Sequence, residues 1–320
     1  MVFFSPIRYG PLDSGQVTRL ATRIGSSLVE LLGVIFVIGL IYSLVFSATH
    51  LIREKVQKTS CLNHLKQIGM GLQGHHDSLN VFPQGTVPGS RENSLFPYLS
   101  WRALILAHID QDNLAKAIPG DYGLSADPFT TEIGKVHQGP GKVITLYGCP
   151  SDSRLTTSWV VTLGDGKQRY LGMSSYLGIN GTHHLNGDGN FFLGSKTRLS
   201  DILDGTSNTI IVGERPPSIN LVYGWWYAGT GWDFSGAGDA HLGVAETNPG
   251  YQYYLECPFG PYSWGETPSN TKVHCREFSF WSLHGRGSHF LFADGSVKWI
   301  QNDNRSILKS LATIQGGELE

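Results

Sequence analysis

Residues 25–50, GSSLVELLGVIFVIGLIYSLVFSATH, decide the fold of this 320-residue chain. Between Leu31 and Ala48 the sequence has no Asp, Glu, Lys or Arg. A helix rises 1.5 Å per residue, so about 18 to 20 apolar residues cross the roughly 30 Å of hydrocarbon in a bilayer. The stretch therefore predicts a transmembrane helix over about residues 28–50.

The residues before this stretch predict its orientation. Three arginines and one acid precede it: Arg8, Asp13, Arg19 and Arg23. Because basic residues stay on the cytoplasmic side, we expect a single-pass protein of the inner membrane with a cytoplasmic amino terminus. Everything beyond about Arg53 is then exported to the periplasm. A conventional secretory signal is the competing interpretation, with residues 47–50 (SATH) as its best cleavage site, but we favour an uncut helix.

Glu30 stands at the amino end of the apolar stretch. An ionised carboxylate near the end of a membrane helix costs a few kcal/mol on insertion, so it needs a partner or a function. In one interpretation Glu30 is an ordinary flank at the level of the lipid headgroups. In the other, the chain is cut after Gly25, and Glu30 neutralises the new amino group on Ser26 of an adjacent copy.

This arrangement resembles the type IV prepilin signal, in which a short basic leader ends in Gly and a Glu follows at the fifth mature position. The resemblance implies that a prepilin peptidase cuts between Gly25 and Ser26 and methylates Ser26. It also implies that Glu30 is the assembly glutamate. Ser26 departs from the pattern, because Phe is usual there. Residues 1–25 are accordingly a leader, outside the folded chain.

Composition bounds the rest of the chain. With 40% hydrophobic and 16% charged residues, 320 residues suffice for the anchor plus one sizeable globular domain or two small ones. A net charge of −2 gives no basic field for nucleic acid. The 40 Gly, 15 Pro, 13 Tyr and 8 Trp indicate an exported part rich in strands and loops.

Apolar residues continue at helical spacing beyond the membrane stretch, at Leu51, Val56, Leu62, Leu65, Ile68 and Leu72. They predict that the helix runs to about His76 and stops before Asn80 and Pro83. A second helix is expected from Ser100 to Ile118.

Strands are expected over Lys142–Gly148, Gln168–Ile179, Asn208–Glu214 and Val222–Gly229. Residues 288–300 predict a hairpin with a two-residue type I′ turn at Asp294-Gly295, and a short helix follows over about Asn304–Thr313. The predicted fold is α+β and pilin-like, with a long N-terminal helix packed on an antiparallel β-rich head. Its parts are residues 1–25 (leader), 26–80 (helix), 81–303 (head) and 304–320 (terminal helix and tail).

Four motifs extend the resemblance along the exported part: Cys61–Gly85, Cys149–Asp152, Asp204–Glu214 and Leu283–Ile300. In this order they are similar to a large planctomycete prepilin-like family, domain of unknown function 1559. Its C-terminal signature is a His, nine residues and then Asp-Gly, matched here by His284, Asp294 and Gly295. The other motif residues that match are Cys61, Cys149, Pro150 and Asp152.

The four cysteines all lie on the exported side, where disulfides form. Four cysteines allow three pairings. Because Cys61 and Cys149 lie in the family motifs and the other two do not, we expect Cys61 to pair with Cys149 and Cys257 with Cys275. Without a close Cys-x-x-Cys pair, zinc is disfavoured.

Other polar residues carry weaker signals. Asp152 is expected to close an Asx turn, and His284 to hydrogen-bond a turn carbonyl or Asp294, with a metal or catalytic role as the alternative. The adjacent histidines at 75–76 and 183–184 would face opposite sides of a strand, which is poor ligand geometry. Residues His184–Asn190 resemble a calcium loop imperfectly, so a Gly/Asn turn is favoured.

The sequence holds no Gly-x-Ser-x-Gly elbow, phosphate loop or His-Glu-x-x-His motif, so we expect no enzyme, no cofactor and no metal. The predicted function is a pseudopilin-like structural subunit. Its expected partners are other prepilin-like subunits, the prepilin peptidase, and a type II secretion or type IV pilus assembly platform. The alternative is a membrane-tethered binding module. For that function, the aromatics of Trp225–Phe234 would form an exposed sugar-stacking platform rather than cover a core.

Overall fold

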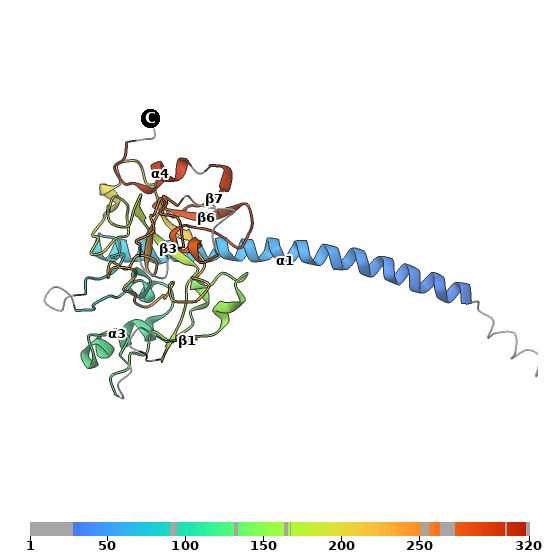
Figure 1. The fold of residues 1–320 in the computed structure, drawn as a ribbon, viewed down its shortest axis with the longest axis horizontal. Coiled ribbons are helices and arrows are strands. Elements are labelled where there is room, and N and C mark those ends of the chain that lie inside the picture. Colours follow the sequence, from blue (N-terminus) through green and yellow to red (C-terminus); the bar gives the residue numbers. More distant parts are fainter. Residues whose placement is uncertain are drawn as a thin grey trace, which may run out of the picture. The chain divides into compact units, whose positions relative to one another are not determined.

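The computed structural model describes residues 28–89, 95–130, 134–162, 166, 168–250, 256–262, 273–304 and 306–317. The chain divides into two compact units, residues 1–53 and residues 54–320. All strands of the described residues belong to the second unit (Figure 1).

Helix α1 (Leu28–Leu79) is 52 residues long, as the sequence predicts. It ends where Asn80 adopts a positive φ of 56° and donates its backbone N–H to the carbonyl of His76. Asn tolerates this left-handed conformation better than most residues, which explains why the helix stops there.

Within the second unit, α1 buries one stripe of side chains at positions i, i+4, i+7 and i+11: Cys61, Leu65, Ile68 and Leu72. This spacing keeps all four on one face of a 3.6-residue helix. Val56, which the sequence pattern assigned to the apolar stripe, is instead 57% exposed. The buried part of the stripe therefore begins at Cys61.

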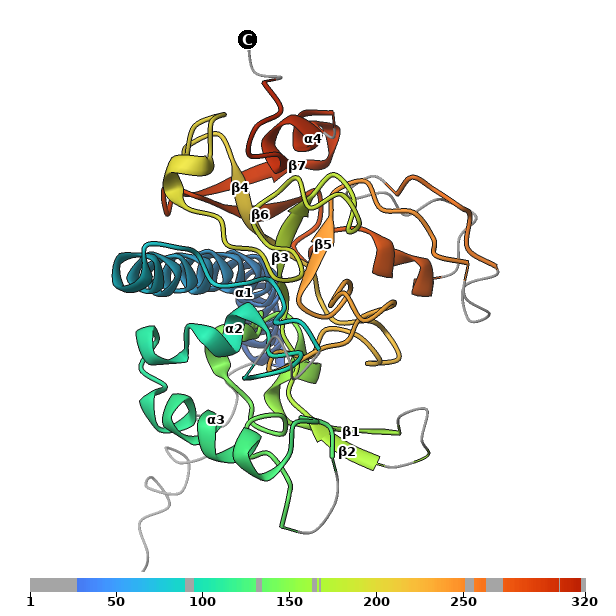
Figure 2. The ribbon, with the colours of Figure 1, turned by 90° about the vertical axis from the view of Figure 1, so that its left-hand side faces the viewer.

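The second unit is built on a five-stranded sheet in the order β5-β3-β4-β6-β7 (Figure 2). Its strands are β3 (Tyr176–Gly181), β4 (Ile210–Glu214), β5 (His241–Gly243), β6 (Gly287–Phe292) and β7 (Val297–Gln301). Neighbours are antiparallel except β3 and β5, which run parallel. The predicted mixed α+β class is thus confirmed, with an apolar N-terminal helix and antiparallel-rich sheets.

Both faces of this sheet are covered. Tyr176 belongs to the same apolar cluster as Leu65 of α1, whereas its neighbour Leu177 belongs to a second cluster with Leu308 of α4 (Ile307–Ala312). Successive strand residues point to opposite faces, so a strand covered on both sides is buried along its whole length. This is why every residue of β3, β4 and β6 is buried.

A second, two-stranded sheet pairs β1 (Trp159–Thr162) with β2 (Gln168–Leu171). The single strand predicted over Gln168–Ile179 is therefore wrong, because β2 and β3 lie in different sheets. The chain leaves β2 at Gly172, where an added Cβ would lie 2.1 Å from the carbonyl oxygen of Lys142. Only glycine allows that close approach.

The second helix is also shorter than predicted. Instead of one helix over Ser100–Ile118, the structure has α2 (Trp101–Leu104), a turn of 3₁₀ helix and α3 (Asp112–Leu124). Asp110 adopts a positive φ of 58°, which a right-handed helix cannot contain. Helix α3 then continues past Pro119.

Two predicted strands are absent from the described residues. Lys142–Gly148 contains a 3₁₀ turn, and Val222–Gly229 makes only isolated bridges, Met173 with Trp225 and Leu99 with Ala228. The 3₁₀ helices of the described residues are η1 (Leu106–His108), η2 (Thr145–Tyr147), η3 (Ser153–Thr156), η4 (Leu199–Asp201), η6 (Val273–Phe278) and η7 (Asn302–Asn304).

The predicted hairpin is present as β6 and β7, but its turn differs from the prediction. Gly295 donates its backbone N–H to the carbonyl of Phe292, and it has a φ of 84°, whereas Asp294 keeps a negative φ. A type I′ turn would need positive φ at both central residues. The loop is therefore a three-residue turn closed by glycine.

Arg102 of α2 is completely buried and links strand β3 to two loops. Its guanidinium donates to the backbone carbonyls of Tyr176 and Trp225, each at 2.9 Å, and to that of Asp239. Burial lowers the pKa of Arg102 to about 10, which leaves it charged at neutral pH. The carbonyls thus replace the water that this charge loses.

We expect Arg102→Met to lower the free energy of unfolding by about 3 to 5 kcal/mol, because three buried carbonyls lose their donor. Urea unfolding of the full chain in detergent, followed by near-ultraviolet circular dichroism, measures this loss. Arg286→Met is the control, since Arg286 is exposed. Equal stability of the two variants would contradict the assignment.

Candidate functional site

The residues of the predicted processing signal lie at or before the start of α1. Gly25 and Ser26 fall outside the described residues. Glu30 lies in the first turn of α1, and its side chain is exposed. It is the one acid in a surface formed mostly by apolar side chains, and every residue from Leu28 to Phe46 is exposed.

Within the described part of the chain, one helical stretch is long and apolar enough to cross a membrane. It covers Leu28–Phe46, 19 residues with a mean hydropathy of 2.5, and none of it is buried. A membrane anchor and a signal sequence both have these properties. Apolar side chains this exposed need a lipid or protein environment, so this stretch is the first candidate functional surface.

The aromatic segment Trp225–Phe234 covers the core instead of forming a platform. Trp225, Trp226, Tyr227 and Trp232 are each at most 7% exposed, and Phe234 alone among the five rings is exposed, at 66%. Sugar stacking needs several exposed coplanar rings, so this segment does not provide them.

The four cysteines pair as the sequence analysis expects. Cys61 of α1 is bonded to Cys149, with Cα atoms 5.4 Å apart, and Cys257 to Cys275, with Cα atoms 5.6 Å apart. Two disulfides indicate that the second unit folds in an oxidising, extracytoplasmic compartment. The first one joins α1 covalently to the segment before η3.

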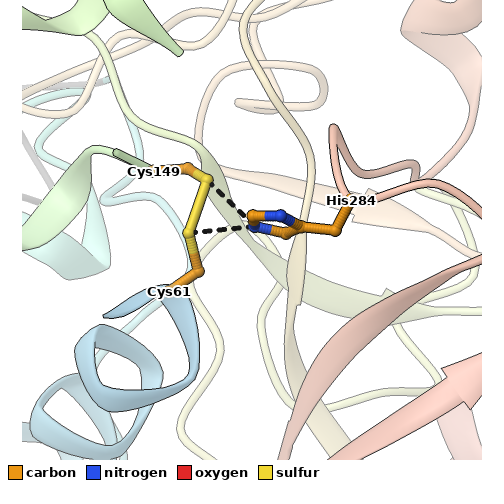
Figure 3. A group of neighbouring side chains, drawn as sticks. All are labelled: Cys61, Cys149 and His284. Atoms are coloured by element: carbon orange, nitrogen blue, oxygen red, sulfur yellow. Dashed lines mark hydrogen bonds between the residues drawn. A yellow bond between two sulfur atoms is a disulfide. The ribbon is translucent and has the colours of Figure 1, made fainter. Parts of the chain in front are cut away.

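His284 lies against the first disulfide (Figure 3). Its Nε2 is 3.1 Å from the sulfur of Cys61 and 3.3 Å from that of Cys149. The expectation that His284 bonds a turn carbonyl or Asp294 is wrong, because β6 lies between them and carries Asp294 to the far end of the hairpin. Burial lowers the pKa of His284, so its imidazole is neutral at neutral pH.

A second layer of polar side chains surrounds His284. The carboxylate of Glu214, at the end of β4, lies 3.9 Å from His284 Nε2 and accepts the backbone N–H of His289 at 2.8 Å. It also contacts His289 Nδ1 at 3.1 Å. The His289 ring packs on Trp299, over which Lys58 of α1 places its ammonium 3.1 Å from the ring centroid.

Sequence reasoning missed Glu214 and His289 as partners of His284. The group comes from α1, the Cys149 loop, β4 and β6, so no local spacing links its members. One signal was available, namely a carboxylate at the end of the apolar run Ile210–Glu214, because a buried acid needs partners.

The other end of the His-x9-Asp-Gly signature also contacts α1. Gln73 donates to the carbonyl of Ala293 at 2.6 Å, next to Asp294. An added Cβ on Gly69 would lie 2.8 Å from Leu291 Cδ1. The signature therefore docks on α1 at both ends, through His284 on Cys61 and through the hairpin turn near Gly69.

The Cys149–Asp152 motif forms the predicted Asx turn. Asp152 Oδ1 accepts the backbone N–H of Arg154 at 3.1 Å, and its other oxygen pairs with the Arg154 guanidinium at 2.6 Å. The carbonyl of Pro150 accepts a hydrogen bond from Gln57 of α1 at 3.4 Å. This motif is thus a second contact between α1 and the loop of Cys149.

A family model described as "Protein of unknown function (DUF1559)" matches residues 51–304. This chain belongs to the DUF1559 family. The match spans every motif from Cys61 to Ile300 and begins after the apolar stretch of α1. Comparison with curated proteins and with solved structures finds no match. The DUF1559 assignment therefore stands, while the prepilin signal and the pilin-like fold stay predictions.

The DUF1559 chain holds a second polar cluster around His184. His183 and His184 would face opposite sides of a strand, but they lie in a turn beyond β3 and their ring centroids are 4.4 Å apart. His184 Nδ1 lies 2.7 Å from Glu246, and its Nε2 lies 3.4 Å from Asp233. Asp188, of the calcium-like loop, instead accepts the backbone N–H of Thr182 at 2.9 Å.

In this cluster two carboxylates keep the His184 ring in its charged, imidazolium form. Burial alone would lower the pKa of His184, but its hydrogen bonds to Asp233 and Glu246 raise that pKa to about 9. The contact with His184 also lowers the pKa of Asp233. The charged ring therefore stabilises the fold at neutral pH.

We expect stability to depend on pH through His184. The folded pKa of about 9 exceeds the unfolded value of 6.5, so the contribution is complete below about pH 6.5 and is lost as pH rises through 9. The advantage of the wild type over His184→Gln should shrink by about 2 to 3 kcal/mol between pH 6 and pH 10. Urea unfolding at both pH values measures it, with the exposed His108→Gln as control. If the difference in unfolding free energy between the wild type and His184→Gln did not change with pH, the charged state of His184 would be contradicted.

The two disulfides should contribute unequally to stability. They close loops with sequence separations of 88 and 18 residues, so chain entropy gives about 4 to 5 kcal/mol for Cys61–Cys149 and about 3 kcal/mol for Cys257–Cys275. Urea unfolding of the two paired Cys→Ser variants compares them directly. A larger loss for the second pair would show that loop closure does not set the order.

Proposed function

We propose that this chain is a membrane-anchored, prepilin-like structural subunit whose role is assembly rather than catalysis. The observation that carries the proposal is the exposed surface of Leu28–Phe46, which bears the single carboxylate of Glu30 near its start. Apolar side chains explain membrane insertion, but an anchor alone gives no use for a carboxylate in that surface.

Side-by-side packing of such helices would use both features. Cleavage after Gly25 would leave a cationic amino group on Ser26, four residues before Glu30 in the sequence. One copy would then offer the partner that the carboxylate of the next copy needs. Gly33 and Gly39 face open space, because an added Cβ at either position meets nothing within 4 Å, so both small residues are available to a neighbouring helix. Small residues let membrane helices approach each other closely.

The second unit fits this function as a head that is bonded to the C-terminal part of α1. Cys61 bonds α1 to Cys149, and the DUF1559 signature contacts the same helix at both ends. A subunit that polymerises through its helix must transmit force to its head, and these contacts would carry it. The partners we propose are other prepilin-like subunits, the prepilin peptidase, and a type II secretion or type IV pilus assembly platform in the inner membrane.

Glu30→Gln should leave processing intact and abolish co-assembly. N-terminal sequencing and intact mass of the membrane-extracted protein should show a chain that begins at methylated Ser26 in both the wild type and the variant. Cross-linked multimers should be lost, by at least about tenfold, in Glu30→Gln, because the buried charge pair is broken. Asp77→Asn, an exposed acid elsewhere on α1, is the matched control.

Two outcomes would overturn this function. A mature chain that begins at Met1 would leave α1 as an anchor only. Processed chains whose multimers survive Glu30→Gln would remove the assembly role of this carboxylate.

A groove beside β2 supports ligand binding as a second candidate function. It has a volume of about 440 Å³ and is lined by Phe129, His137 and Tyr170, among other residues. Tyr170 is 66% exposed there, so an aromatic ring is available to a ligand. The short name of the family model, SBP_bac_10, weakly hints at such a binding module. Tyr170→Ala would abolish ligand capture if this function holds, and would leave multimers unchanged if the subunit function holds.

A further inference from the structure

The cluster around Cys61 contains more polar groups than a disulfide needs. The donor atoms of Cys61, Cys149 and His284 lie within 4.8 Å of one another, and Glu214 lies 3.9 Å from the imidazole Nε2. The side chains of His284 and Glu214 are 0% and 3% exposed. Disulfide sulfurs are neutral and accept hydrogen bonds only weakly, so they give a buried carboxylate no compensation.

The imidazole of His284 is also incompletely paired. Its Nδ1 has no hydrogen-bond partner among the described residues, and its Nε2 faces only the two sulfurs and the more distant carboxylate. A buried polar atom without a partner is unfavourable by about 1 to 3 kcal/mol in general. We take the unpaired imidazole as a sign that His284 has a further partner in another state of the protein.

We propose that, in the thiol form of the chain, Cys61, Cys149 and His284 bind one Zn²⁺ ion, and that the Glu214 carboxylate moves toward them as the fourth ligand. Two thiolates, an imidazole and a carboxylate are ligands that zinc accepts, four in number and tetrahedral. Zinc–ligand bonds of about 2.0 to 2.3 Å place ligand atoms roughly 3.3 to 3.8 Å apart. The two sulfurs lie 3.1 and 3.3 Å from His284 Nε2, close to this range. The Glu214 oxygen lies 3.9 Å from Nε2, so its side chain must move to complete the tetrahedron.

The surroundings suit a metal site as well. The backbone N–H of His289 donates to Glu214 and fixes the carboxylate, which is how ligands are commonly oriented by a second layer of residues. Two thiolates and one carboxylate around Zn²⁺ leave a net charge of −1. Lys58 of α1 interacts favourably with Glu214 and lies beside this site, so it balances that charge.

The reaction balances without a reductant, because the chain is synthesised with thiols. The thiols of Cys61 and Cys149 release two protons as Zn²⁺ binds. Oxidation by a disulfide-bearing oxidant then transfers two electrons to that oxidant, forms the Cys61–Cys149 bond and releases Zn²⁺. The metal and the disulfide are therefore alternative cross-links between α1 and the Cys149 loop.

The His183–His184–Glu246 group, whose donor atoms are equally close, does not serve as such a site. Leu185 donates its backbone N–H to His183 Nδ1 at 3.2 Å, so the ring proton sits on Nε2, the nitrogen that faces Glu246. A protonated nitrogen cannot ligate a metal.

The test uses the full chain in detergent, reduced with a phosphine under argon and titrated with Co²⁺ as a spectroscopic substitute for Zn²⁺. We expect one Co²⁺ per chain, with thiolate-to-cobalt charge-transfer absorption that Zn²⁺ abolishes. Cys61→Ser/Cys149→Ser should lose this absorption, and the control Cys257→Ser/Cys275→Ser should keep it. Glu214→Gln should retain the absorption with affinity lowered about 10 to 100-fold.

Thiol alkylation of the reduced wild type provides a test that needs no variant. Saturating Zn²⁺ should protect Cys61 and Cys149 from alkylation but leave Cys257 and Cys275 reactive, as peptide mapping by mass spectrometry would show. Equal protection of all four cysteines, or of none, overturns the proposal. So does Co²⁺ absorption that survives the loss of Cys61 and Cys149.

Discussion

Burial of one face of α1 is the constraint on which the exported unit depends. The stripe at Cys61, Leu65, Ile68 and Leu72 has no exposed surface, so the five-stranded sheet and the α2–α3 segment must both cover it. Close contact requires small residues on the helix, because an added Cβ on Gly71 would lie 2.6 Å from Ile109 Cγ2. Helix propensity alone would disfavour this glycine, so packing outweighs propensity at this contact. The disulfide and the family signature add to an interface that side-chain packing already defines.

Buried charge is handled differently in three parts of the same unit. The guanidinium of Arg102 is hydrogen-bonded to three backbone carbonyls in place of water, and the charged form of His184 is stabilised by two carboxylates. Each of these groups binds loops to the core, which matters in a chain that has 40 glycines. His284 is the exception, because its ring is neutral and partly unpaired beside a disulfide. Arg102 and His184 therefore stabilise the fold, whereas His284 is free to act as the metal ligand proposed above.

The sequence was informative where one local pattern decided the outcome. The uncharged run before Ala48 and the Asn at position 80 predicted both ends of α1, and β4 and the β6–β7 hairpin follow from apolar runs next to turn residues. It was misleading where contacts between distant residues decided the structure, as at Gly172, which packs on the carbonyl of Lys142 at the point where the chain leaves one sheet for the other. The candidate site shows the same limit. Motif membership predicted the Cys61–Cys149 pair, but no spacing along the chain places His284 on those sulfurs or Glu214 beside them.

The order of the cysteines has a consequence for how the protein matures. Each disulfide joins cysteines that are consecutive in the sequence, Cys61 with Cys149 and then Cys257 with Cys275. When a chain emerges into an oxidising compartment from its amino end, the first two thiols to appear are partners, and so are the last two. Oxidation in order of arrival therefore yields the native pairs. Biogenesis of this protein should require a thiol oxidase, and no disulfide isomerase.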